Sequence, residues 1–248
     1  MRSLILAVQF LTRLPTPQVT AFTKDELATT APWFSIVGLI VGLAVAGAAW
    51  LGARLDPWLG ALLGLITWVW ITGALHLDGL ADLVDALGAA HRDPQRFLQV
   101  MRDPHVGSFG VIALVMQLIS KLVLLQLIIA HHHFNWFLLP LICAWSRLGA
   151  IAWSAWLPTL SSGTAEAVTW KSNSTMMFVS VTLLLIASLV APSLVISPLV
   201  LFAWWMFLHF RLGGMTGDCL GAGIELTETT LLLITLCSPI TIDLKVLL

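Results

Sequence analysis

Seven apolar stretches, each close to the length needed to cross a bilayer, constrain this sequence more than any other feature. A membrane-spanning helix needs about 20 predominantly apolar residues, with some tolerance for tilt. The stretches lie at 33–50, 58–75, 107–130, 134–157, 176–196, 198–212 and 217–237. The sixth is short and the seventh contains acidic residues. The sequence therefore predicts an all-α fold, a polytopic membrane bundle of about seven transmembrane helices.

The composition excludes two classes of protein. Only 10% of the residues are charged and 58% are hydrophobic, whereas a soluble domain has about 25% charged residues. The formal net charge of -1 offers no electrostatic surface for nucleic acid, so no nucleic-acid partner is expected. The three cysteines have no paired spacing, which argues against a disulfide framework or a zinc site. With no linker or repeat, residues 1–248 form one expected membrane domain.

The N-terminal segment is too short to span a bilayer. About nine apolar residues between Leu4 and Leu14 cannot cross a hydrocarbon core of about 30 Å. Small residues of a signal-peptide cleavage site are missing there, so we expect the segment to remain in the mature protein. A short helix is predicted, lying at the membrane interface or packed against the bundle.

The distribution of lysine and arginine predicts the orientation of the bundle. Positive residues are retained on the cytoplasmic side, and an inside N-terminus places eight of them there and two outside. The eight are Arg2, Arg13, Lys24, Arg92, Arg96, Arg102, Lys171 and Arg211; the two are Arg54 and Lys245. This orientation places two segments at the cytoplasmic face: 76–105 lies there, and 211–228 begins there. These segments hold most of the candidate catalytic and binding residues.

An acidic segment carries the first candidate site. Asp78, Asp82 and Asp85 are spaced i, i+4 and i+7, so they fall within an arc of about 60° on one helix face. Three like charges on one face repel one another unless a cation lies among them. Oxygen ligands favour magnesium, manganese or calcium over zinc, and magnesium commonly bridges to substrate phosphates. The alternative is a solvated acidic face paired with nearby arginines.

A second acidic pair follows a glycine-rich turn. Asp218 and Glu225 are spaced i and i+7, and Glu225 would lie about 10 Å deeper along its helix. A carboxylate within a membrane segment is a functional candidate by default. The turn 213–217 offers backbone N–H groups to a phosphate. Lys121 and Arg147 also lie within apolar segments, where a structural ion pair or snorkelling is as well supported as a substrate contact.

Three blocks of sequence carry a family resemblance. The block HLDGLADLVDALGAAHRDPQRFLQVMRDPHVGSFG, the block GGMTGDCLGAGIELTE and the N-terminal FLTRLPTP resemble the cobalamin synthase family, the adenosylcobinamide-GDP ribazoletransferases. Their order and spacing agree over almost the whole chain. The resemblance implies a multi-pass enzyme of the bacterial cytoplasmic (inner) membrane with a cytoplasmic-side active site. It also implies magnesium-dependent transfer of the adenosylcobinamide-phosphate group from adenosylcobinamide-GDP to α-ribazole or its 5'-phosphate, with release of GMP.

The resemblance also implies roles for individual residues. Asp78, Asp82 and Asp218 would hold the metal, and Asp85 would be a further ligand or the base. His76 is an alternative base only if the helix begins at Asp78, since within the helix it points about 160° from Asp82. The expected substrate-binding residues are Arg92, Arg102, His105, Arg147, Thr216, Gly217 and Glu225.

Two other functions and several partners follow from the same residues. A transporter would use intramembrane charges such as Glu225, Lys121 and Arg147, although it would need them near the midplane. A CDP-alcohol-type phosphotransferase acting on a lipid alcohol is the other alternative. The expected partners are the two small-molecule substrates and the lipid bilayer. The family setting adds the enzymes that activate those substrates, and the number of subunits is left open.

Overall fold

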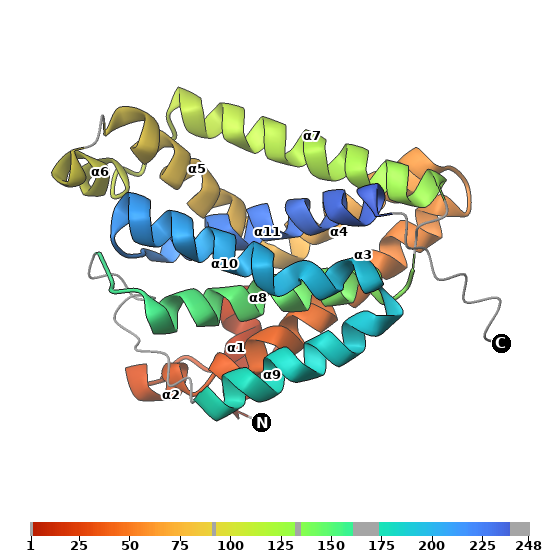
Figure 1. The fold of residues 1–248 in the computed structure, drawn as a ribbon, viewed down its shortest axis with the longest axis horizontal. Coiled ribbons are helices and arrows are strands. Elements are labelled where there is room, and N and C mark those ends of the chain that lie inside the picture. Colours follow the sequence, from red (N-terminus) through yellow and green to blue (C-terminus); the bar gives the residue numbers. More distant parts are fainter. Residues whose placement is uncertain (1, 91–92, 132–134, 161–173, 239–248) are drawn as a thin grey trace.

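The described parts of the chain form helices and an isolated bridge between Thr159 and Met215. The computed structural model describes residues 2–90, 93–131, 135–160 and 174–238. Its elements are α1 (Arg2–Leu11), α2 (Lys24–Ala28), η1 (Ala31–Trp33), α3 (Phe34–Ala53), α4 (Pro57–Thr72), α5 (Leu75–Ala89), α6 (Pro94–Val100), α7 (Ser108–Ala130), α8 (Leu138–Trp156), α9 (Ser174–Ala187), η2 (Ser188–Val190), η3 (Pro192–Ile196), α10 (Ser197–Phe207), η4 (Leu208–Leu212) and α11 (Gly217–Cys237). The long helices run along the longest axis of the molecule (Figure 1).

The membrane-spanning helices follow the predicted pattern with two differences. Within the described residues, five segments are long and apolar enough to span a bilayer, and α4 with α5 would make a sixth. The five are Asp25–Ala53, Ser108–Ala130, Leu138–Trp156, Pro192–Leu212 and Gly217–Cys237. The expected span 58–75 instead ends at Thr72, and the expected span 176–196 contains the 14-residue α9 followed by short 3-10 turns. The prediction of an all-α membrane bundle is confirmed.

A sharp bend separates α4 from α5 and directs α5 toward the site. The two helix axes differ by 84°, and Gly73 and Ala74 both adopt left-handed backbone angles, with φ of 60° and 58°. A left-handed conformation costs a residue with a Cβ about 1–2 kcal/mol, so Ala74 stores strain at this point. A Cβ at Gly73 would meet the Arg13 side chain. The bend lets α5 pack against α11 rather than continue the span.

The predicted short N-terminal helix is present as α1. Its buried residues Leu6, Ala7 and Leu11 face the bundle, and α1 packs against α3. The Phe10 and Phe34 rings lie 6.1 Å apart, centre to centre. Of the two predicted positions, α1 therefore occupies the one packed against the bundle.

Glycines bring two pairs of helices into close contact. In α3, Gly38 and Gly42 lie directly against the backbone of α8, with no room for a Cβ. In α5, a Cβ at Gly79 would lie 2.8 Å from the Cα of Asp218 in α11. Small residues at such contacts are typical of membrane helices, whose association depends on close packing. The second contact fixes the distance between the two acidic segments.

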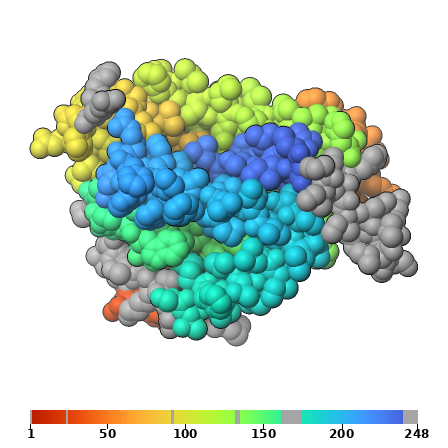
Figure 2. Space-filling model, viewed as in Figure 1, coloured from red at the N-terminus to blue at the C-terminus, as the bar shows by residue number. Residues whose placement is uncertain are grey.

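The outer surface is apolar where α9 and α10 cover the bundle. Figure 2 shows both helices on one face, with α10 across its middle and α9 along its lower edge. Their exposed side chains include Phe178, Leu183, Ile186, Leu199 and Phe202. A contiguous apolar surface of this kind is unfavourable in water and natural in contact with lipid tails. The surface therefore supports assignment of the chain to a membrane.

Candidate active site

Carboxylates from the two acidic segments converge where α5 crosses α11. Asp78 is exposed and Asp82 is half-buried on α5, while Asp218 follows Gly217 in the first turn of α11. The negative charges of Asp78 and Asp218 both act on Asp82. The acids form two walls of the site, Asp78 and Asp82 on α5 and Asp218 on α11. Because Gly79 contacts the Asp218 backbone, packing holds these two acidic walls together. The structure thus brings together three of the predicted metal-site residues.

Asp85 has a different position from the other acids of α5. Its side chain is buried and accepts hydrogen bonds from the backbone N–H groups of Gly107, at 2.7 Å, and Gly110, at 2.9 Å. These groups lie at the start of α7, where an anion satisfies free N–H donors and the helix dipole. A Cβ at either glycine would collide with the Asp85 carboxylate. In this structure Asp85 holds the N-terminus of α7.

A pocket of about 270 Å³ adjoins the acidic residues. It lies among α1, α3, α5, α8 and α11, and its polar side chains are His76 and Asp218. His76 is 3% exposed, and neither of its ring nitrogens has a hydrogen-bond partner among the described residues. Since α5 begins at Leu75, His76 is within the helix and leaves a different face from Asp82. His76 could serve as the base only if the helix began at Asp78, and that condition is not met.

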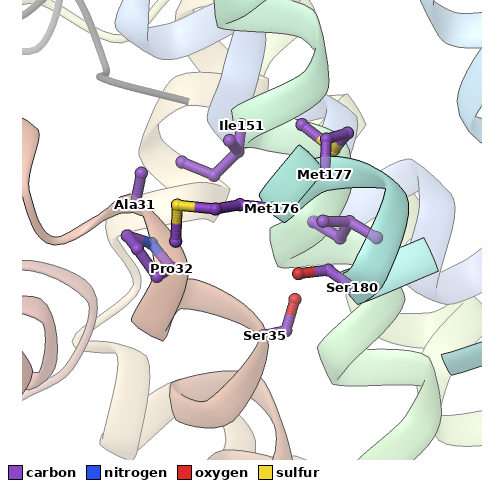
Figure 3. A pocket seen from close by; sticks show the side chains of 8 residues that line it. Ala31, Pro32, Ser35, Ile151, Met176, Met177 and Ser180 are labelled. Atoms are coloured by element: carbon purple, nitrogen blue, oxygen red, sulfur yellow. The ribbon is translucent and has the colours of Figure 1, made fainter. Parts of the chain in front are cut away.

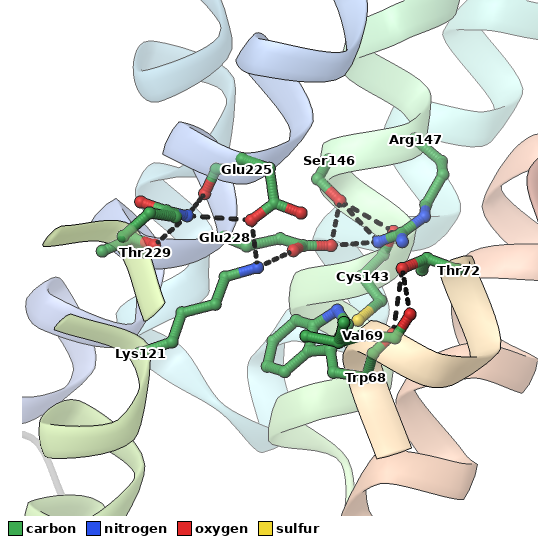
Figure 4. A network of polar contacts seen from close by, with 11 residues as sticks. Trp68, Val69, Thr72, Lys121, Cys143, Ser146, Arg147, Glu225, Glu228 and Thr229 are labelled. Atoms are coloured by element: carbon green, nitrogen blue, oxygen red, sulfur yellow. Dashed lines mark hydrogen bonds and ion pairs between the residues drawn. The ribbon is translucent and has the colours of Figure 1, made fainter. Parts of the chain in front are cut away.

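Deeper in the bundle, charged residues form a buried network (Figure 4). The Lys121 ammonium on α7 lies 2.7 Å from the Glu225 carboxylate and 2.6 Å from that of Glu228. The guanidinium of Arg147 on α8 pairs with the other oxygen of Glu228. Gln117 donates to Glu225 at 2.9 Å. Glu225 and Arg147, expected to bind substrate, are therefore engaged in ion pairs that link α7, α8 and α11.

Sequence reasoning missed two members of this network. Glu228 lies three residues after Glu225, and its position in an apolar helix was a sufficient signal, because an acid inside a membrane helix needs a partner. Gln117 carried no comparable signal, since a single amide in an apolar segment is common. The Lys121 ammonium also lies 4.4 Å from the centre of the Trp68 ring, a favourable cation–π distance.

The remaining predicted residues lie in several places. Thr216 is a buried helix cap whose hydroxyl accepts from the Cys219 N–H at 3.2 Å. Arg102 and His105 are exposed in the connection between α6 and α7. A hydrogen bond from the His105 ring, 2.7 Å long, lowers the pKa of the Asp103 carboxyl. Gly217 is the first residue of α11, and Arg92 lies outside the described residues.

The carboxylates suit a cation that brings most of its own ligands. Within the described ranges, no three histidine, cysteine, aspartate or glutamate side chains are arranged as a ready-made metal site. Magnesium does not require one, because it keeps several waters and binds through one or two carboxylates together with substrate phosphates. The half-buried oxygens of Asp82 and Asp218 and the exposed Asp78 match that type of donor set.

Two other pockets are poor candidates for a polar substrate. The pocket between the start of α3 and α9 (Figure 3) has a volume of about 20 Å³, room for little more than one water molecule. A groove of about 500 Å³ between α10 and α11 is lined by apolar residues and two threonines, without charged groups. Of these three pockets, the one at His76 and Asp218 combines room for a small molecule with ionisable side chains.

Comparison with known proteins identifies the family. The family model described as cobalamin-5-phosphate synthase matches residues 3–236. The chain belongs to the cobalamin-5-phosphate synthase family. It is 56% identical to an adenosylcobinamide-GDP ribazoletransferase of Laribacter hongkongensis, over 94% of this chain and 96% of the relative. A protein of the same name from Pseudomonas aeruginosa is 36% identical over 94% of this chain and 96% of the relative. No solved structure matches the chain.

Family membership accounts for where the site residues lie. The convergent acids come from HLDGLAD in the first of the resembling blocks and from TGD in the second. MRDPHVG, also in the first block, supplies Gly107, whose backbone N–H donates to Asp85. The motifs of this cobalamin-5-phosphate synthase family member therefore meet along α5.

Proposed function

We propose that this protein transfers the adenosylcobinamide-phosphate group of adenosylcobinamide-GDP to α-ribazole or its 5'-phosphate and releases GMP. The reaction belongs to the assembly of the cobalamin nucleotide loop. Relatives with this name that match 94% of the chain support the assignment. The observation that carries it is the convergence of Asp78, Asp82 and Asp218 from two distant blocks beside a pocket. A lipid-alcohol phosphotransferase and a transporter are less well supported.

The chemistry is a displacement at phosphorus. A ribazole hydroxyl oxygen forms a bond to the phosphorus that carries the corrinoid, and the bond from that phosphorus to the GMP oxygen breaks. The hydroxyl proton passes to a carboxylate, for which we assign Asp82, because it is half-buried and close to both Asp78 and Asp218. A base within hydrogen-bond reach of the attacking group contributes substantially to such a step.

Asp78 and Asp218 are the residues that would hold magnesium, which needs only one or two carboxylates, and Asp82 would remain available as the base. A bound magnesium ion would neutralise negative charge on the pyrophosphate oxygens. The protein itself holds the two acidic walls at a fixed separation through the Gly79 contact with Asp218. Its Asp85 fixes the start of α7, directly after the connection that holds the exposed Arg102 and His105. Arg102 is our candidate for contact with the pyrophosphate.

The site would face the cytoplasm of a bacterial inner membrane. The end of α5, α6 and the turn before α11 lie at the same end of the bundle (Figure 1). Both substrates are soluble molecules, and the excess of lysine and arginine in these segments favours their retention in the cytoplasm.

A release assay tests the proposal. Purified protein in nanodiscs, supplied with adenosylcobinamide-GDP, α-ribazole 5'-phosphate and magnesium, should release GMP. Omission of either substrate should stop release, and EDTA should lower the rate by at least about 100-fold. GMP release that proceeds with a lipid alcohol in place of ribazole would favour the lipid phosphotransferase. Absence of release from folded protein with both substrates present would refute the transferase assignment.

A further inference from the structure

The lining of the pocket beside the acidic residues combines apolar and ionisable side chains. Most of its lining is apolar and includes Phe10 and Leu11 from α1, Phe34 from α3 and Ile224 from α11. The exceptions are His76 and Asp218. Asp218 is half-buried and belongs to the acidic cluster, whereas His76 lies against the buried interior. A ligand in this pocket would therefore have an apolar body and a polar group, with its reacting end near Asp218.

His76 indicates that something polar enters the pocket. The side chain is 3% exposed, and both ring nitrogens lack hydrogen-bond partners among the described residues. Buried polar groups in folded proteins are nearly always paired, so each exception calls for a water or a ligand. A neutral imidazole offers one donor and one acceptor, which matches a hydroxyl group that both accepts and donates.

The volume of the pocket distinguishes between the two proposed substrates. At about 270 Å³, it is slightly smaller than most small-molecule sites, which span about 300–1,000 Å³. The corrinoid substrate is several times larger and cannot enter. A single nucleoside with a flat aromatic base is of the right size, and its base would lie near the Phe10 and Phe34 rings, which favour aromatic partners.

We propose that this pocket binds the α-ribazole moiety, with its aromatic base against the apolar lining and a ribose hydroxyl on His76. The assignment rests on the proposed function and adds which substrate occupies which part of the site. Bound in this way, the nucleoside presents its reacting hydroxyl toward Asp218 and the acidic cluster. The corrinoid pyrophosphate then approaches from the exposed side, where Asp78 lies. His76 acts as a positioning residue and takes no proton from the reaction.

Filling the pocket tests the proposal directly. Ala150 lines it from α8, so Ala150→Phe should occupy the space for the base. We expect the KM for α-ribazole 5'-phosphate to rise at least about tenfold, while the KM for adenosylcobinamide-GDP stays within about twofold. Ala203→Phe is the matched control, because Ala203 lines the separate groove between α10 and α11 and should change neither constant.

A second variant covers the case in which Ala150→Phe does not fold. His76→Phe removes the hydrogen bond without adding charge, and His76→Asn retains a donor and an acceptor. We expect His76→Phe to raise the KM for ribazole and His76→Asn to restore part of the loss, with kcat changed less than KM. If His76 only holds a structural water, both variants will leave the ribazole KM unchanged, and the proposal is refuted.

A binding measurement separates this proposal from the proposed function. Equilibrium dialysis of α-ribazole against wild-type, Ala150→Phe and Ala203→Phe protein in nanodiscs needs no corrinoid and no turnover. Weaker binding to Ala150→Phe than to Ala203→Phe supports the pocket assignment. Equal binding to both refutes it, even when wild-type protein releases GMP. Failure of the wild-type protein to release GMP refutes the transferase itself.

Discussion

At the residue scale, Glu228 is the centre of the buried charge network. It pairs with both Lys121 and Arg147, and Glu225 pairs with Lys121 from the other side. Two cations and two carboxylates thus balance within the bundle. Removal of one partner from a buried pair leaves an uncompensated charge in an apolar interior, where solvation is lost.

Glu228→Gln should therefore destabilise the protein strongly. We expect a loss of about 3–5 kcal/mol, because both Lys121 and Arg147 lose an anionic partner. The measurement is the apparent melting temperature in detergent. Glu26→Gln is the control, since Glu26 forms an exposed pair with Arg2 worth at most about 1 kcal/mol. Equal melting temperatures for the two variants would contradict the structural role of the network.

Asp85 is predicted to affect stability more than chemistry. Asp85→Asn places an amide N–H₂ against one of the two glycine N–H donors, which should cost about 1–3 kcal/mol. The melting temperature should fall, while GMP release per folded molecule should remain measurable. If Asp85→Asn melts like the wild type but loses as much turnover as Asp82→Asn, Asp85 takes part in the reaction and this prediction is wrong.

The sequence predicted part of the site at this scale. Spacing placed Asp78, Asp82 and Asp85 on one helix face, and that geometry is local to the chain. The spacing of the acids could not show that α7 begins beside Asp85, because this contact joins residues more than twenty positions apart. For the same reason, the sequence left a structural ion pair at Arg147 as an open alternative but did not predict its partner, Glu228.

At the scale of elements, apolar length predicted most helices and missed the bend between α4 and α5. Residues 58–75 are predominantly apolar and contain no proline, so Gly73 was the one residue near their end that could mark a break. The bend depends on two left-handed residues and on the packing of α5 against α11. Tertiary contacts of this kind override an apolar pattern that would otherwise continue the helix.

The contact between α5 and α11 should tolerate no added side chain at Gly79. A Cβ there would lie 2.8 Å from both the Cα and the carbonyl oxygen of Asp218, so Gly79→Ala should separate the two acidic walls and abolish GMP release. Gly47→Ala is the control, because a Cβ at Gly47 meets nothing within 4 Å and should stabilise α3 by about 0.5–1 kcal/mol. Normal turnover by Gly79→Ala would mean that the wall separation is unimportant.

At the scale of the whole molecule, the charged connections define two ends of the bundle. Figure 1 shows α6 at one end and the turn between α3 and α4 at the other. Leu55 in that turn is 82% exposed, and Asp103 is exposed near α6. The predicted orientation places Asp103 in the cytoplasm and Leu55 outside it.

Cysteine labelling of intact cells tests this orientation. In a background carrying Cys237→Ser, which removes the exposed cysteine, Leu55→Cys should react with a membrane-impermeant maleimide and Asp103→Cys should not. Permeabilised cells should label both, which controls for accessibility. If Asp103→Cys alone is labelled in intact cells, the orientation is the reverse of the predicted one and the acidic residues lie outside the cytoplasm.

The central claim is that acids of α5 and α11 together form the active site of the transferase. GMP release by Asp82→Asn and Asp218→Asn, compared with wild type and Asp56→Asn in the same nanodiscs, tests it most directly. Asp56 is exposed in the turn between α3 and α4, and an asparagine can still cap α4, so its variant should retain wild-type turnover. We expect a loss of at least about 100-fold for each of the other two variants without a matching loss of folded protein. Wild-type GMP release by either Asp82→Asn or Asp218→Asn would contradict it.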